Sequence, residues 1–157
     1  MVLTLPDPAS RTEADGSTFR AKLISLLTPY KVAVEELDVK TREQIAVFGG
    51  TGTLTVGAGS ARFRFPWAVT ILGVSATVGT APTGASILID VNKNGTTLFT
   101  TQSARPTILA SAFVTTTEAV PAITTLIAGD YLTVDRDQIG STIAGADLSV
   151  FIRYKLT

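Results

Sequence analysis

The 157-residue chain contains no cysteine and no histidine, and its 13 basic residues balance its 13 acidic residues. The missing cysteines exclude disulfides and thiol nucleophiles, and the missing histidines exclude His-based triads and almost every zinc or copper site. A neutral chain without a Lys- or Arg-rich block lacks the charge that binds a phosphate backbone, so we expect no nucleic-acid partner. The composition therefore predicts a protein that is not an enzyme and that needs neither a metal nor another cofactor.

Threonine is the residue type that the chain has in excess, with 25 copies, and 45% of its residues are hydrophobic. The branched Cβ of threonine suits a pleated sheet, and its hydroxyl suits the solvent side of a strand. The apolar content is sufficient for a core, and the length fits one domain better than two. These features predict a folded, β-rich chain.

Apolar and polar residues alternate along most of the chain after residue 50. The clearest case is the C-terminal run, where every second residue from Leu148 to Leu156 is apolar. Between residues 70 and 78 the even positions are apolar, which predicts that Leu72, Val74 and Ala76 share an inward face. Such alternation is typical of half-buried antiparallel strands. Further strands are expected at residues 53–56, 62–65, 86–91, 96–100, 107–110, 122–127 and 131–135. Because turn signals separate these strands at short intervals, we expect an all-β, antiparallel, jelly-roll-like sandwich or barrel.

Charged residues are concentrated at the start of the chain, where residues 1–49 hold 13 of the 26 charges. We therefore expect two parts: an N-terminal arm and charged attachment segment at 1–49, and a β-barrel domain at 50–157. The boundary is placed at the glycine-rich residues 49–52.

The N-terminal part is expected to be extended at its start. Leu3 and Leu5 stand beside Pro6 and Pro8, a combination that predicts an arm rather than a helix. Residues 18–27 fit a short helix that Pro29 would end, and they fit a strand nearly as well.

The stretch from Phe65 to Ile89 contains no charged residue and raises the question of a membrane segment. It holds two prolines, three glycines and many hydroxyl side chains, so its mean hydropathy is too low for a spanning helix. We therefore expect a pair of strands here and no membrane partner.

A glycine-rich turn, Gly49-Gly50-Thr51-Gly52, follows the strand-like residues 45–48 and is similar to the dinucleotide loop of Rossmann dehydrogenases. That loop must lead into a helix, whose free N–H groups bind the pyrophosphate. Here another strand-like run follows at residues 53–56, so we expect a turn without a nucleotide.

The run from Asp90 to Gly95 matches the first six positions of an EF-hand calcium loop. The twelfth position, which must supply a bidentate glutamate, is Thr101, and both flanks are strand-like. We therefore expect a hairpin that turns at Asn94-Gly95, because both residue types tolerate positive φ.

Four aspartates near the C-terminus are the remaining candidates for paired-carboxylate chemistry or a metal: Asp130, Asp135, Asp137 and Asp147. Paired acids must lie across one cleft to act together. Nothing in their spacing brings any two of them together, so solvated turn positions are the expectation.

The segment from Thr80 to Phe99 resembles a signature of β-sandwich proteins in tailed-bacteriophage particles, through its Pro82-Thr83-Gly84 turn and its run from Asp90 to Gly95. Residues 105–108 and 127–150 follow the same pattern, so the resemblance covers about residues 60–156. Proteins of this group include head decoration proteins, head fibres and tail or receptor-binding components, and they are usually trimers.

The resemblance implies a structural virion protein, a trimeric capsid decoration (cementing) protein that stabilises a bacteriophage head. Its expected partners are the major capsid protein and two copies of itself, and its expected location is the capsid surface after assembly in the host cytoplasm. The residues expected to contact the capsid are Leu3, Leu5, Pro6, Pro8 and Phe19, and those expected at a trimer or core seam are Phe63, Phe65 and Trp67. The alternative is a tail-tip or fibre module that recognises a host surface carbohydrate, for which Trp67 and Tyr131 are candidates.

Overall fold

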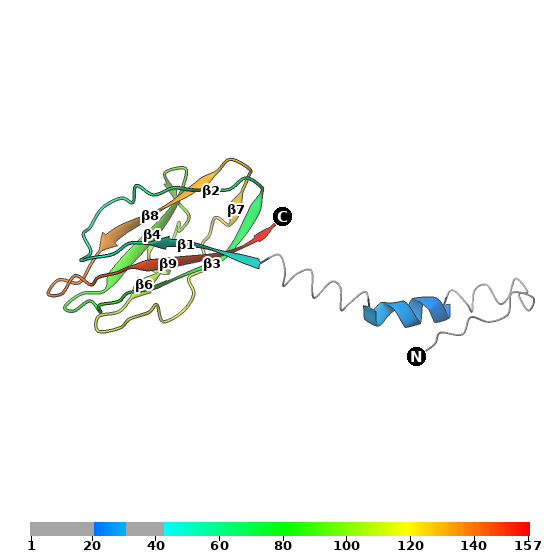
Figure 1. The fold of residues 1–157 in the computed structure, drawn as a ribbon, viewed down its shortest axis with the longest axis horizontal. Coiled ribbons are helices and arrows are strands. Elements are labelled where there is room, and N and C mark those ends of the chain that lie inside the picture. The colour runs from blue at the N-terminus through cyan, green and yellow to red at the C-terminus, as the bar shows by residue number, and fades with distance from the viewer. Residues whose placement is uncertain (1–20, 31–42) are drawn as a thin grey trace, which may run out of the picture. The chain divides into compact units, whose positions relative to one another are not determined.

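The computed structural model describes residues 21–30 and 43–157 (Figure 1). The chain divides into two units, Met1–Thr41 and Arg42–Thr157. Residues 43–49, which the sequence analysis placed in the N-terminal segment, therefore fall in the second unit. In the described part of the chain, no helix is long and apolar enough to cross a membrane.

In the first unit, residues 21–30 form a helix. It overlaps the helix expected at 18–27, whose first three residues lie outside the described ranges. The helix continues through Pro29, where the sequence predicted its end. Pro29 has no N–H to donate to the carbonyl four residues earlier, and its ring crowds that carbonyl. In the same turn the Thr28 hydroxyl donates a 2.6 Å hydrogen bond to the Ile24 carbonyl.

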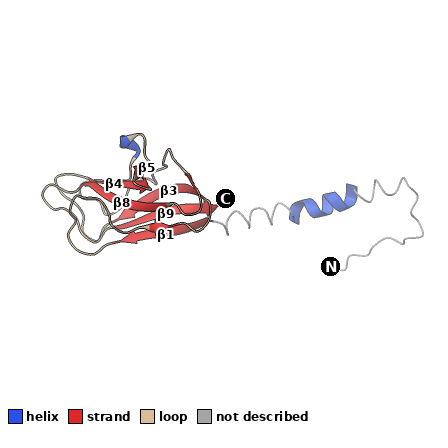
Figure 2. Cartoon of the chain, turned by 90° about the horizontal axis from the view of Figure 1, so that it is seen from above, coloured by secondary structure: helices blue, strands red, loops and turns tan. Residues whose placement is uncertain are grey.

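The second unit is a sandwich of two antiparallel sheets (Figure 2), which confirms the predicted all-β antiparallel class. The first sheet has the order β1-β9-β3-β7, with β1 at Glu43–Gly49, β9 at Ser149–Leu156, β3 at Val69–Thr77 and β7 at Thr125–Leu126. The second has the order β2-β8-β4-β5, with β2 at Phe63–Arg64, β8 at Tyr131–Gln138, β4 at Ile87–Lys93 and β5 at Thr96–Thr97. Strand β6 at Thr107–Ile108 also pairs with β4, and a 3₁₀ turn, η2, covers Gln102–Ala104.

Successive strands alternate between the two sheets over much of the chain. Strands β1, β3, β7 and β9 belong to the first sheet, whereas β2, β4, β5, β6 and β8 belong to the second. Each crossing places sequence neighbours in opposite layers, so the sheet partners are distant in sequence.

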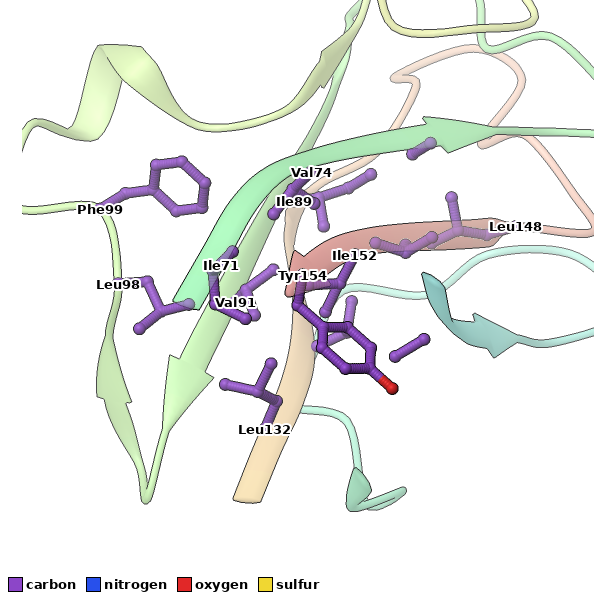
Figure 3. Packing of buried hydrophobic residues seen from close by; sticks show 14 of the residues in the cluster. Ile71, Val74, Ile89, Val91, Leu98, Phe99, Leu132, Leu148, Ile152 and Tyr154 are labelled. Atoms are coloured by element: carbon purple, nitrogen blue, oxygen red, sulfur yellow. The ribbon is translucent and has the colours of Figure 1, made fainter. Parts of the chain in front are cut away.

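The core lies between the two sheets. Val150, Ile152 and Tyr154 of β9 are buried, as the period-two pattern of the C-terminal run predicted. Figure 3 shows Ile152 and Tyr154 with Ile71 of β3 and Val91 of β4, whose side chains also point into the space between the layers. The sandwich is therefore held by alternate side chains of strands from both sheets.

Strand β3 departs from the predicted alternation at Leu72. Its pairing with β9 shifts by one residue between Ile71 and Gly73. Because this bulge uses one extra residue, the inward face changes from Val69 and Ile71 to Val74 and later even positions. The prediction that Leu72 lies inward with Val74 was therefore wrong.

The structure also corrects one expected strand and confirms one expected turn. Residues 53–56 form only an isolated bridge, from Thr53 to Ala146, because glycines at positive φ, Gly52 at 92° and Gly57 at 152°, turn the chain on both sides. Strands β4 and β5 pair around Asn94-Gly95, where φ is 51° and 87°. These angles are those of the expected hairpin turn.

Candidate functional site

The outward side of the first sheet carries large apolar side chains at its β1 margin. In the β1–β9 register, Val47 lies opposite Phe151 and Ile45 lies opposite Arg153, and directly paired residues share a face. Ile45 is 60% exposed and Val47 is 53% exposed, while Ala46 between them is buried in the core. Strand β1 thus has apolar side chains on both faces: Ala46 faces the core, and Ile45 and Val47 face outward.

A long connection extends this face beyond β3. Its backbone bonds to β3, with the Thr115 amide donating to the Ala76 carbonyl at 3.0 Å and the Val74 and Ala119 amides exchanging bonds of 2.8 Å. Val114 bridges to Thr77, which is paired with β9 on the outward side. Val114 is 52% exposed and Val120 is 64% exposed. We call the outward face formed by Ile45, Val47, Phe151, Val114 and Val120 the apolar sheet face.

A three-residue ion cluster crosses the middle of the sheet. Arg153 donates to both carboxylate oxygens of Glu118, at 3.0 and 2.6 Å, and to Glu43 at 3.1 Å. These bonds lower the pKa of the Glu118 carboxyl and raise that of the Arg153 guanidinium. A Cβ at position 73 would overlap the Glu118 side chain, so Gly73 is the residue that lets Glu118 lie across β3. Each of the three side chains thus has an ion-pair partner, although two carboxylates share one guanidinium and the cluster is left with a net negative charge.

Strand β1 is also the outermost strand of its sheet. It pairs with β9 on one side, and no described strand pairs with its other side. An edge strand presents alternate N–H and C=O groups that can pair with another chain, and folded proteins commonly protect such edges with proline, lysine or a bulge. The seven residues of β1 contain none of these, and their one charged side chain is Glu43 at the start of the strand, which is paired with Arg153. The free edge and the exposed Ile45 and Val47 therefore lie at one margin of the sandwich.

Asp130 is a structural residue that fastens two turns together. Its carboxylate accepts hydrogen bonds from the Lys93 ammonium at 2.9 Å, the Asn94 amide at 2.6 Å and the Ile127 backbone at 2.8 Å. The Lys93 ammonium is the main cause that holds the pKa of this carboxyl below its usual range, with the Asn94 and Ile127 donors adding to it. The carboxylate is thus fully used in joining the β4–β5 hairpin to the turn before β8.

The other three aspartates each have a partner of their own. Asp135 accepts bonds from the Gly59 amide and the Asn92 side chain, at 2.9 and 2.8 Å. Asp137 pairs with Arg105, and Asp147 accepts a 2.7 Å bond from the Gly52 amide. Among the described residues, no three acidic side chains form a group that could hold a metal.

Polar groups of the EF-hand-like run, residues 90–95, and of the glycine turn, residues 49–52, likewise form hydrogen bonds within the chain. Asp90 accepts bonds from the Thr97 hydroxyl at 2.7 Å and the Val91 amide at 2.8 Å, while burial raises the pKa of its carboxyl. Gly50 and Gly52 donate their amides to the Leu148 carbonyl and to Asp147. An extended chain follows the glycines where a phosphate loop needs a helix.

No family model and no curated protein matches the chain. Among solved structures, the chain is similar to a protein described as the cyanophage Pam1 capsid asymmetric unit, with 16% sequence identity and a TM-score of 0.46. The likeness covers 73% of this chain and 84% of that one.

The structure separates the residues predicted at a seam. Phe65 is buried in the core, and its ring centroid lies 5.0 Å from that of Phe63 and 5.1 Å from that of Tyr154. Phe63 is half-buried, and its ring centroid lies 6.4 Å from that of Phe48 of β1 in an edge-to-face arrangement. Trp67 is 66% exposed. Phe65 thus belongs to the core and Phe63 packs against it, while a role of the three residues in a trimer seam stays a prediction.

The residues predicted to contact a capsid lie outside the described ranges: Leu3, Leu5, Pro6, Pro8 and Phe19. The apolar sheet face itself was not predicted from the sequence. Its signal was present in residues 45–48, where four consecutive apolar residues leave no polar side for solvent. A strand with that pattern has apolar side chains on both faces, and only one of them can face its own core.

We predict that Asp130→Asn lowers the free energy of unfolding by about 2 kcal/mol at pH 7, because a hydrogen-bonded charge is replaced by a neutral amide. The folded pKa of Asp130 is lowered, so its stabilising contribution is complete above the unfolded pKa of about 3.9 and is lost as the pH falls through the folded value. Urea unfolding of the wild type and of Asp130→Asn between pH 7 and pH 2.5 measures this contribution. The difference in unfolding free energy should shrink below pH 4.

The control is Asp137→Asn, which changes a more exposed carboxylate whose one partner among the described residues is Arg105. This substitution should lower the free energy of unfolding by less than about 1 kcal/mol, because exposed ion pairs contribute little. Equal losses for the two variants at pH 7 would contradict the structural role assigned to Asp130.

Proposed function

We propose that the chain is a trimeric decoration protein that binds the major capsid protein on the surface of a bacteriophage head. The observation that carries the proposal is the apolar sheet face beside the free edge of β1. The resemblance of residues 60–156 to tailed-phage virion proteins supports the choice of a particle as the place of assembly. On this proposal the protein stabilises the head by adding contacts between capsid subunits.

The apolar sheet face fits a contact that excludes water. Folded monomers rarely expose large contiguous apolar patches, and those that do commonly use them as interfaces. Here Ile45 and Val47 are more than half exposed, and Phe151 lies beside Val47 on β9. The Glu43–Arg153–Glu118 cluster, which carries one more carboxylate than guanidinium, would lie within the contact as a charged group that fixes orientation more than it adds affinity.

The N-terminal unit supplies the proposed capsid attachment. The described helix, residues 21–30, exposes five large side chains: Leu23, Ile24, Leu26, Leu27 and Tyr30. An isolated helix of this length is marginal in water, so packing against a partner would stabilise it. The predicted arm residues Leu3 and Leu5 would extend that contact along the capsid.

A structural role also fits the use of the chain's acidic residues. Asp130, Asp135, Asp137 and Asp147 all hold loops or strands in place. Carboxylates used in this way are not poised for acid–base chemistry, which requires a group directed at a substrate. We therefore propose assembly rather than catalysis as the function.

One observation favours the second candidate function, a tail-tip or fibre module that recognises a host carbohydrate. Tyr131, one of the two aromatic residues suggested for it, lines a polar hollow on the second sheet. Trp67, the other, is exposed but does not line that hollow.

We predict that Val47→Glu converts a trimer into a monomer without unfolding the sandwich. The substitution places a charge in the proposed contact but not in the core, so the midpoint of urea unfolding should change little. Sedimentation velocity measures the oligomeric state. The matched control is Val56→Glu, because Val56 is 60% exposed in a loop outside the apolar sheet face; this variant should remain a trimer. A wild-type chain that is a monodisperse monomer and never adds to phage heads would refute the proposal.

We predict that deletion of residues 1–17 abolishes binding to phage heads and leaves the β-sandwich folded. The reason is that the arm provides capsid contacts while all described core residues belong to the second unit. Co-sedimentation with heads that lack the protein measures binding, and far-UV circular dichroism checks the fold. If the shortened chain fills the heads to the same occupancy as the full chain, the attachment role of the arm is wrong.

A further inference from the structure

The outward side of the second sheet contains a polar hollow of about 410 Å³, formed by β4, β8 and the loop that precedes β2. Tyr131, Thr133 and Asp135 reach it as alternate residues of β8, while Leu132 and Val134 between them point into the core. Adjacent residues of a strand point to opposite faces. The core packing of β8 therefore fixes which three side chains line the hollow.

The loop at residues 58–60, which lies beside β8 and lines the hollow, is held in a defined position. The Gly59 amide donates to one carboxylate oxygen of Asp135, and the Asn92 side chain donates to the other. A Cβ at position 59 would overlap the Val134 carbonyl, so only glycine allows the loop to approach the strand this closely. At the far end, the Arg62 guanidinium stacks 4.8 Å from the centre of the Tyr131 ring.

Several polar groups of the hollow are unused by the protein. The hydroxyls of Ser60, Tyr131 and Thr133, and the side-chain carbonyl of Asn92, have no hydrogen-bond partner in the described part of the chain. They are not burial defects, because every buried side-chain polar atom described has a partner. Groups of both donor and acceptor type thus face one accessible volume from preformed positions, and placed polar groups of this kind are what orient a ligand in a binding site.

We propose that this hollow binds a neutral carbohydrate. A sugar hydroxyl both donates and accepts, and it can therefore use the free hydroxyls, the Asn92 carbonyl and the remaining lone pairs of Asp135. The charged residues that line the hollow are one cation, Arg62, and one anion, Asp135, so the lining has no net charge to attract a charged ligand of either sign. The proposal gives the second candidate function a site and a ligand class, and it requires neither a trimer nor binding to a capsid.

The test is binding of the full chain to a glycan array that contains neutral, acidic and amino-sugar glycans, followed by titration calorimetry with the neutral glycan that binds best. The double variant Ser60→Ala, Thr133→Val removes two free hydroxyls and keeps the contacts of Asp135. We expect its affinity to fall by at least about tenfold, which corresponds to 1.4 kcal/mol. The matched control, Thr100→Val with Ser103→Ala, changes the same residue types outside the hollow and should bind as the wild type does.

Three results would overturn the proposal: no neutral glycan binds, only charged glycans bind, or the double variant keeps wild-type affinity. Loss of binding in Trp67→Ala with full binding in the double variant would also overturn it, because the site would then lie at Trp67. The titration is repeated with Val47→Glu. Retained binding in that variant would show that the glycan site stands whether or not the sheet-face assembly is correct.

Discussion

The pairing of β9 with β1 on one side and β3 on the other is the constraint on which the rest of the sandwich depends. Val150, Ile152 and Tyr154 fill the core from this one strand, and the residues between them are fixed on the opposite face. A slip of one residue would exchange the two sets and expose the apolar side chains. The core therefore determines the register, and the register determines what the outer face of the sheet presents.

Because the register is fixed, β9 places Phe151 beside Val47 and Arg153 beside Ile45 on the outer face. The bulge in β3 adds to this arrangement, since it sets Gly73 opposite Arg153 and leaves room for Glu118. The apolar sheet face is thus a consequence of core packing together with one glycine. The second sheet has the opposite character on its outer side, where β4 and β8 carry the polar side chains of the hollow. One sandwich consequently offers two chemically different surfaces, one suited to assembly and one to a small polar ligand.

The strands could be predicted from the sequence wherever one face of the strand is buried and the other is exposed to solvent. The C-terminal run and the Asn94-Gly95 hairpin are of this kind, and the structure confirms both. Leu72 was misplaced because a bulge consumes a residue without changing the composition of the strand. Residues 43–49 were assigned to the N-terminal segment because their charged start, Glu43, continues the charged region before it, and pairing with β9 cannot be read from local pattern. The polar hollow could not be predicted from the sequence either, because Arg62, Asn92 and Tyr131, which line it, come from three separate segments.

Amide hydrogen exchange of β1 tests the central claim, that the outer face and edge of the first sheet are the assembly surface. Exchange is measured by mass spectrometry for the isolated chain at high dilution and for the chain bound to phage heads, with β8 as the internal reference. The account predicts that the amides of residues 43–49 exchange more slowly on the heads, while those of β8 change little. Unchanged exchange in β1 on heads that carry the protein would contradict it.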